Sequence, residues 1–157
     1  MTVDPALTRT LNELGETMGL GSLTLDDDGS VALQFDDLPA VNLQYRQGED
    51  LFWLYADLGV PAAGAAAYED LLRGNLFWRA TLGATFALSG GDPPSVVLSQ
   101  PLPWRGATVA SLANVLATFA NTIEDWAQVL KAATTDTDAA ADPASRDVED
   151  FNSFIRV

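Results

Sequence analysis

The sequence contains no histidine and no cysteine among its 157 residues. Without histidine it lacks the usual general base near neutral pH and the commonest metal ligand. Without cysteine it cannot form a disulfide, a thiolate nucleophile or a structural zinc site. Nucleophile pairs of the Ser–His and Cys–His kind are therefore excluded. We predict a protein that is not an enzyme and holds no metal and no cofactor.

Basic residues are scarce. Eight Lys and Arg stand against 22 Asp and Glu, a net charge of −14. Nucleic acids and anionic membrane surfaces both need basic patches, so neither is expected as a partner. The acidity fits a basic partner, or a protein that must stay soluble while it displays apolar surface, and the composition leaves both open. No run reaches the ~18 apolar residues of a membrane span, and the N-terminus lacks a signal pattern. We predict a cytoplasmic protein with no membrane insertion.

The acidic residues do not form a recognisable site. Asp26–Asp28, Asp36-Asp37 and Glu49-Asp50 fall in turns between strand-like runs, where solvated carboxylates are expected. The turn ending at Gly29 does not fit an EF-hand loop, which would require oxygen ligands at both ends. No nucleotide-binding glycine motif is present. A hydrolase with two buried carboxylates is a remote alternative.

Three segments have helical periodicity. The first begins at Asp4-Pro5, a cap followed by proline at the first helical position, and ends at Gly19 or Gly21. Its apolar face is Leu7, Leu11, Leu14 and Met18. The second spans about Gly64 to Arg79. The third, about Ala107 to Lys131, has the strongest apolar stripe of the chain.

Six short runs read as strands between turn residues: Ser22–Leu25, Val31–Phe35, Val41–Tyr45, Leu51–Leu58, Thr85–Ser89 and Val96–Gln100. Alternating apolar and polar residues with turns at each end favour antiparallel hairpins. The predicted order is α-β-β-β-β-α-β-β-α, an α+β domain with three helices on an antiparallel sheet of about five to six strands.

Residues 1–131 are predicted to form this single domain, and residues 132–157 an acidic, flexible tail. Ala132–Ala141 contains only Ala, Thr and Asp, a linker-like composition. Val148, Phe151 and Ile155 could line a short terminal helix. The sequence leaves open whether this tail is frayed or docks on its own body or on a partner.

The second helix carries more large apolar residues than one core-facing stripe can absorb: Leu71, Leu72, Leu76, Phe77 and Trp78. Either the helix is buried on several sides within one chain, or the excess face is a dimer interface, since obligate dimer contacts resemble a core cut in half. Trp53 and Tyr55 pose the same question on the fourth strand-like run.

The order of motifs resembles one family, the class I type III secretion chaperones, named for the chaperone of the translocated intimin receptor (Tir). The first helix leads into Gly19-Leu20-Gly21-Ser22, and acidic turns with short strands follow. Leu71-Leu72-x-x-Asn75-Leu76-Phe77 then runs into Leu82-Gly83-Ala84-x-Phe86-Ala87-Leu88. Val96–Gln100 precedes Leu102-Pro103, and the last helix carries Phe119 and Trp126. The resemblance covers about residues 5–131.

The resemblance implies a bacterial cytoplasmic homodimer whose fold has three helices and a twisted antiparallel sheet. Such a chaperone binds the N-terminal region of a secreted effector in extended form and keeps it soluble without hydrolysing nucleotide. It implies a dimer interface on the second helix and neighbouring strands, at Trp53, Tyr55, Leu72, Leu76, Phe77 and Trp78. It implies effector contacts at Leu23, Leu25, Val31, Leu33, Phe35, Val41 and Leu43. An acidic immunity or antitoxin-like protein that blocks a basic toxin is the alternative.

Overall fold

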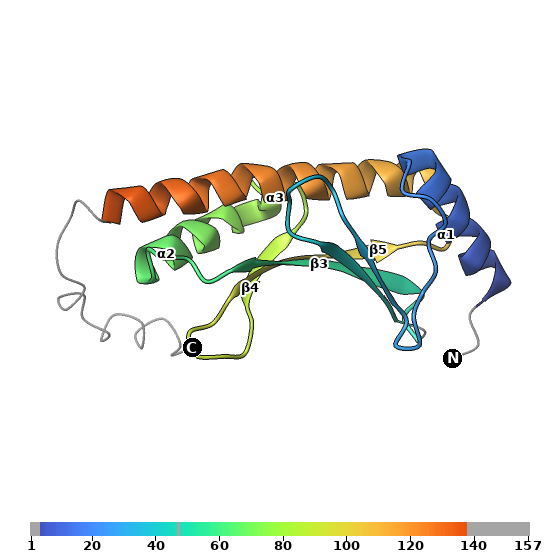
Figure 1. Ribbon diagram of the computed structural model, residues 1–157, viewed down its shortest axis with the longest axis horizontal. Helices are drawn as coiled ribbons and strands as arrows, with labels where there is room; N and C mark the ends of the chain where they lie inside the picture. Colours follow the sequence, from blue (N-terminus) through green and yellow to red (C-terminus); the bar gives the residue numbers. More distant parts are fainter. Residues whose placement is uncertain (1–3, 47, 138–157) are drawn as a thin grey trace.

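A computed structural model describes residues 4–46 and 48–137 of the chain. The helices are α1 (Pro5–Met18), α2 (Ala65–Gly74), the short 3-10 helix η1 (Leu76–Trp78) and α3 (Val109–Thr137). The strands are β1 (Ser30–Leu33), β2 (Val41–Arg46), β3 (Leu51–Gly59), β4 (Thr85–Leu88) and β5 (Val96–Pro103). The three α-helices lie on one side of the sheet (Figure 1), which confirms the predicted α+β class.

Helix α1 begins and ends as its sequence predicts. The Asp4 carboxylate accepts a hydrogen bond from the Ala6 N–H at 2.9 Å, and Pro5 takes the first helical position. Gly19 ends the helix in the left-handed conformation, with φ of 70°. Leu7, Leu11 and Leu14 are buried on the face that packs against α3.

The sheet has five antiparallel strands in the order β1-β2-β3-β5-β4. Along β3, Phe52, Leu54 and Ala56 are buried in the core, whereas Trp53 and Tyr55 point to the opposite face and are half-buried. Strand β2 alternates in the same way. Because side chains alternate with a period of two, the sheet presents one face to the helices, and within residues 4–46 and 48–137 no helix packs on the other.

The predicted strand Ser22–Leu25 does not form, so the sheet has five strands rather than six. Asp26 explains the difference, since its N–H donates to the Ser30 carbonyl at 2.8 Å and its Oδ1 accepts from the Ser30 N–H at 2.8 Å. These bonds occupy both outward main-chain groups of Ser30, the first residue of β1. The segment instead lies against α1, where a Cβ at Gly15 would overlap the Gly21 carbonyl oxygen.

Two predicted helix ends are also corrected. Helix α2 ends at Gly74 rather than Arg79, because Phe77 and Trp78 have φ of 54° and 52°, a left-handed backbone that a right-handed helix cannot contain. The chain then turns through η1. Phe77 and Trp78 therefore do not lie on α2 as predicted. Helix α3 continues to Thr137, past the predicted end at Lys131. The proposed terminal helix through Val148, Phe151 and Ile155 lies outside the described residues.

Arg105 joins the start of α1 to the turn between β2 and β3. Its guanidinium contacts the Asp4 carboxylate at 3.3 Å and the Asp50 carboxylate at 3.0 Å. It also lies 4.7 Å from the centre of the Trp104 ring. The start of α1, the β2–β3 turn and the end of β5 are thus joined at one exposed side chain. Within the described part of the chain, no helix is long and apolar enough to cross a membrane.

Candidate protein-interaction surface

Six large apolar side chains are at least half exposed along the segment from α2 to β4. They are Leu72 (62%), Leu76 (64%), Phe77 (75%), Trp78 (56%), Leu82 (60%) and Leu88 (50%). We call this group the α2–β4 patch. Contiguous exposed apolar surface is uncommon on monomeric proteins and marks a site where another molecule binds.

The patch is held in place by side-chain hydrogen bonds rather than left as a loose loop. The Trp78 indole N–H donates to Thr85 Oγ1 at 2.9 Å, and the Trp126 indole N–H donates to the Ala80 carbonyl at 3.0 Å. Phe77 and Trp78 have φ of 54° and 52°, a left-handed backbone that bulky residues rarely adopt. Such strain at exposed apolar residues indicates a preformed binding surface.

A cavity of about 310 Å³ opens beside the patch, between α2 and the edge strand β4. It is lined by Tyr68, Leu71, Leu72, Phe86, Ala87 and Leu88. Apart from the Tyr68 hydroxyl, which donates to the Pro94 carbonyl at 3.4 Å, these side chains are apolar. The cavity therefore suits an aliphatic or aromatic side chain from a partner.

Trp53 and Tyr55, the other predicted dimer residues, lie on the face of the sheet that the helices leave uncovered. The register places Tyr55 opposite Ser99 on β5, and Ser99 opposite Thr85 on β4. Thr85 in turn bonds Trp78. A row of cross-strand neighbours thus links Tyr55 on this sheet face to Trp78 of the α2–β4 patch.

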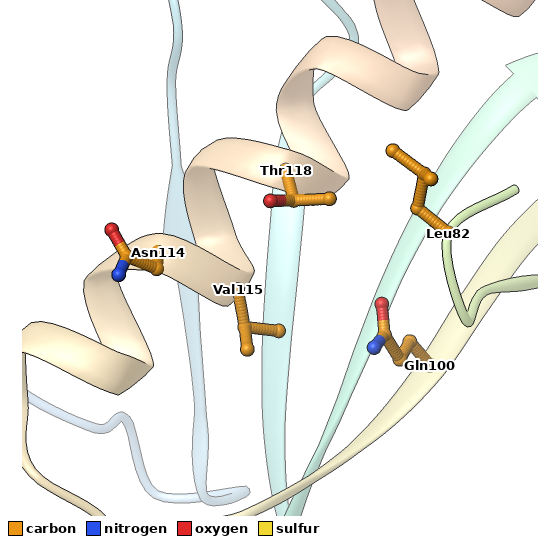
Figure 2. Close-up of a pocket in the computed structure, with 5 residues that line it drawn as sticks. All are labelled: Leu82, Gln100, Asn114, Val115 and Thr118. Atoms are coloured by element: carbon orange, nitrogen blue, oxygen red, sulfur yellow. The ribbon is translucent and has the colours of Figure 1, made fainter.

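A second, smaller hollow of about 180 Å³ lies between α3 and β5 (Figure 2). Asn114, Val115 and Thr118 of α3 face Gln100 and the exposed Leu82 across it. Its polar groups are amides and a hydroxyl, none of which titrates near neutral pH. The hollow extends the patch at Leu82 and offers hydrogen bonds rather than acid–base chemistry.

The structure places the seven predicted effector-contact residues in two groups. Leu23, Leu33, Val41 and Leu43 are buried in the core, where they hold the sheet to the helices. Leu25, Val31 and Phe35 are half-buried around β1, at the edge of the sheet. Of the seven, only these three side chains offer surface to a partner while the domain stays folded.

The carboxylates remain at the surface. Hydrogen bonds from the main-chain N–H and hydroxyl of Ser30 lower the pKa of Asp26, and the hydrogen bond from Arg105 lowers the pKa of Asp50. The Ser30 bonds close the turn that begins at Asp26, whereas the Arg105 bond joins the β2–β3 turn to the segment after β5. Among residues 4–46 and 48–137, no group of three or more His, Cys, Asp or Glu side chains is placed to hold a metal ion.

Sequence reasoning missed Leu82, Leu88 and the 310 Å³ cavity. Leu88 sits on the core-facing side of β4, which alternation alone would assign to the interior. It is exposed because β4 is an edge strand that α2 covers only in part. The signal that could have found it is the continuation of apolar residues from α2 through η1 into β4.

A family model describes a large part of this arrangement. The model of the Tir chaperone protein (CesT) family matches residues 9–127, a span that includes the α2–β4 patch, both hollows and the whole sheet. The chain belongs to the Tir chaperone protein (CesT) family. The resemblance read from the motifs is thereby confirmed.

Solved structures with this fold support the assignment. The CesT-family chain is 25% identical to a chain of the ExsC–ExsE complex, with a TM-score of 0.70, covering 83% of this chain and 97% of that one. A chain in the structure of the Yersinia pestis type III secretion chaperone SycH with a fragment of YscM2 is 24% identical in sequence, with a TM-score of 0.60. The match covers 78% of this chain and 98% of that one. The predicted chaperone fold, with three helices and an antiparallel sheet, is confirmed.

The same fold occurs in a protein that is not described as a chaperone. YbjN of E. coli, described as a putative transcription regulator, is 20% identical with a TM-score of 0.59, covering 80% of this chain and 91% of YbjN. A search of curated proteins finds no match. The family model, rather than the fold alone, therefore carries the assignment to the chaperones. None of these findings supports the immunity-protein alternative.

Proposed function

We propose that this chain is a type III secretion chaperone that acts as a homodimer in the bacterial cytoplasm. It holds the N-terminal segment of a secreted effector in extended form and keeps it competent for secretion without hydrolysing nucleotide. The observation that carries this proposal is the preformed α2–β4 patch on a chain of the CesT family. Neighbours determined with a partner, such as the ExsC–ExsE complex, support effector binding.

The dimer interface is assigned to the α2–β4 patch with Trp53 and Tyr55. Leu72, Leu76 and Phe77 are among the most exposed large apolar side chains described. Full burial of such side chains contributes about 1.5–3 kcal/mol each. A second copy that covers the patch would remove its largest apolar groups from water, and the hydrogen bonds of Trp78 and Trp126 reduce the ordering cost of binding.

The effector segment is assigned to the opposite edge of the sheet, beside β1. There an extended chain can add as a further strand, with main-chain hydrogen bonds providing affinity and alternate side chains contacting Leu25, Val31 and Phe35. A net charge of −14 favours basic segments and keeps the dimer soluble between clients. No step in this cycle needs a catalytic group.

Co-purification followed by limited proteolysis tests the function. The chain is expressed with the proteins encoded beside it, and the complex is digested. We expect protection of an unfolded N-terminal segment of about 50–100 residues in one partner, because disordered segments wrap large surfaces. Protection of a compact folded domain, with binding that weakens steeply in salt, would instead support the immunity protein.

A further inference from the structure

In the described part of the chain the sheet ends in two edge strands, β1 and β4, and the hydrogen-bond alternation shows which of their residues face outward. On β4 the main-chain groups of Phe86 point away from β5, because a side chain outside the sheet contacts both of them. On β1 the Tyr45 N–H donates to the Gly29 carbonyl, so the alternate residues Ser30 and Ala32 face outward. An added strand would need these groups.

The β4 edge is occupied by Asn75. Its Oδ1 accepts from the Phe86 N–H at 2.8 Å, and its Nδ2 donates to the Phe86 carbonyl at 3.1 Å. One side-chain amide thus presents the same donor and acceptor pair as a residue of a neighbouring strand. Asn75 is itself fixed at the end of α2, where its N–H donates to the Leu71 carbonyl at 3.1 Å.

This closure matters because β4 is otherwise the more attractive edge. Leu88 is 50% exposed there, and the apolar cavity of about 310 Å³ opens beside it. The N–H of Ala84, at the other end of the strand, already donates to the Thr81 carbonyl. With Phe86 taken by Asn75, no two successive outward residues of β4 are free to pair with an added strand.

The β1 edge is closed only at its start. Asp26 takes the N–H and carbonyl of Ser30, and the outward groups of Ala32 follow. Val31 and Phe35, both half-buried, flank this open position. Natural proteins use such local devices to guard sheet edges. On β4 the guard lies in the middle of the strand and leaves only the last residue, Leu88, whereas on β1 it lies at the first residue and leaves Ala32 inside the strand.

We propose that Asn75 is a specificity-determining residue: its amide closes the β4 edge and so directs an extended effector segment to Ala32 on the β1 edge. The assignment rests on the proposed function. It also implies that a second copy covers the α2–β4 patch through side chains and does not continue the sheet through β4.

Residue-resolved hydrogen exchange on the chaperone, free and bound to the protease-protected effector segment recovered by co-purification, tests this directly. We expect the Ala32 amide to exchange at least tenfold more slowly in the complex, with the Phe86 amide unchanged. In free Asn75→Ala, the Phe86 amide is expected to exchange at least tenfold faster than in the wild type. Asn75→Asp keeps an acceptor for the Phe86 N–H, so its Phe86 amide is expected to exchange at a rate between those of the wild type and Asn75→Ala.

A proline variant provides a second readout that does not depend on replacing Asn75. Ala32→Pro removes the outward N–H of the β1 edge, where proline is tolerated, and is expected to weaken segment binding at least tenfold. Ala110→Pro, at an exposed position in the first turn of α3, is the control and is expected to leave segment binding within twofold. Equal binding by the two variants, or slowed exchange at Leu88 with Ala32 unchanged in the wild-type complex, would overturn the assignment while leaving the chaperone function intact. Recovery of no segment would overturn the function itself.

Discussion

Helix α1 and the α2–β4 segment carry similar apolar residues and use them in opposite ways. Leu7, Leu11 and Leu14 of α1 are each at most 2% exposed, whereas Leu76 and Phe77 are 64% and 75% exposed. The first set has its partners within the chain, where α1 packs against α3. The second set is equally apolar, and its side chains are held out toward solvent.

The difference shows that the apolar side chains of α1 are buried within one chain, whereas those of the α2–β4 patch are left for another molecule to cover. Hydrogen bonds from Trp78 and Trp126 hold the exposed segment in a fixed, strained shape. A chain that merely tolerated exposed apolar residues would have no need to order them. The contrast is therefore the physical basis for assigning this surface to a second copy, and the variants below challenge it.

The largest effect is expected from a matched pair of leucine truncations. Leu11→Ala removes a buried side chain and leaves a cavity, so we expect a loss of about 2–5 kcal/mol in the free energy of unfolding. Leu76→Ala, measured at a concentration where the chain is monomeric, is expected to change it by less than about 0.5 kcal/mol. Urea unfolding measures both, and equal losses would abolish the contrast between the two regions.

Gly74→Ala tests how the exposed segment is anchored. A Cβ at this position meets the Trp126 ring at 2.5 Å, so the indole must move and its bond to Ala80 is strained. We expect a loss of about 1–3 kcal/mol in unfolding free energy, as for overpacked cores. Gly48→Ala is the control, because nothing lies within 4 Å of a Cβ there. If Gly48→Ala loses as much unfolding free energy as Gly74→Ala, crowding at Trp126 is not the cause of the loss.

The anchored shape of the patch, unlike its composition, could not be predicted from the sequence. Periodicity predicted α1, α3 and most strands, and the excess of apolar residues indicated an interface. It could not show the left-handed backbone at Phe77 and Trp78, and so it extended α2 to Arg79; nor could it show that Gly74 meets Trp126, a contact between residues far apart in the chain. Strand propensity likewise favoured a strand at Ser22–Leu25. It could not take into account the Asp26–Ser30 bonds that exclude the strand, because these depend on local geometry. Burial of Leu33 and Leu43 followed from alternation, yet family analogy assigned them to the effector.

Trp78→Phe tests a smaller contribution, that of the hydrogen bond between Trp78 and Thr85. The substitution keeps an aromatic ring but removes the indole donor to Thr85 Oγ1. We expect a loss of about 0.5–1.5 kcal/mol in dimer stability, the usual net value of one hydrogen bond, with the far-ultraviolet circular dichroism unchanged. Thr85→Val completes a double-mutant cycle with Trp78→Phe. The double variant should lose less dimer stability than the sum of the two single variants, because both remove the same hydrogen bond. Strict additivity would mean that the bond does not order the patch.

The smallest effect concerns pH and belongs to the packed half. The pKa of Asp26 is lowered in the folded chain by its bonds to Ser30. Its stabilising contribution is therefore present above the unfolded value of 3.8 and lost as pH falls through the folded pKa. Asp26→Asn is expected to be slightly less stable than the wild type at pH 7 and to converge with it below pH 3.8. Asp27→Asn controls for net charge, and a gap that persists at low pH would contradict the linkage.

The central claim, that the α2–β4 patch joins two copies, is tested most directly by the native mass from light scattering at micromolar concentration. The account predicts twice the 16.7 kDa of one chain for the wild type and for Ala110→Glu, an exposed control at the start of α3. It predicts a folded species of one chain mass for Leu76→Glu. A wild-type monomer, or a Leu76→Glu dimer as stable as the wild type, would contradict it.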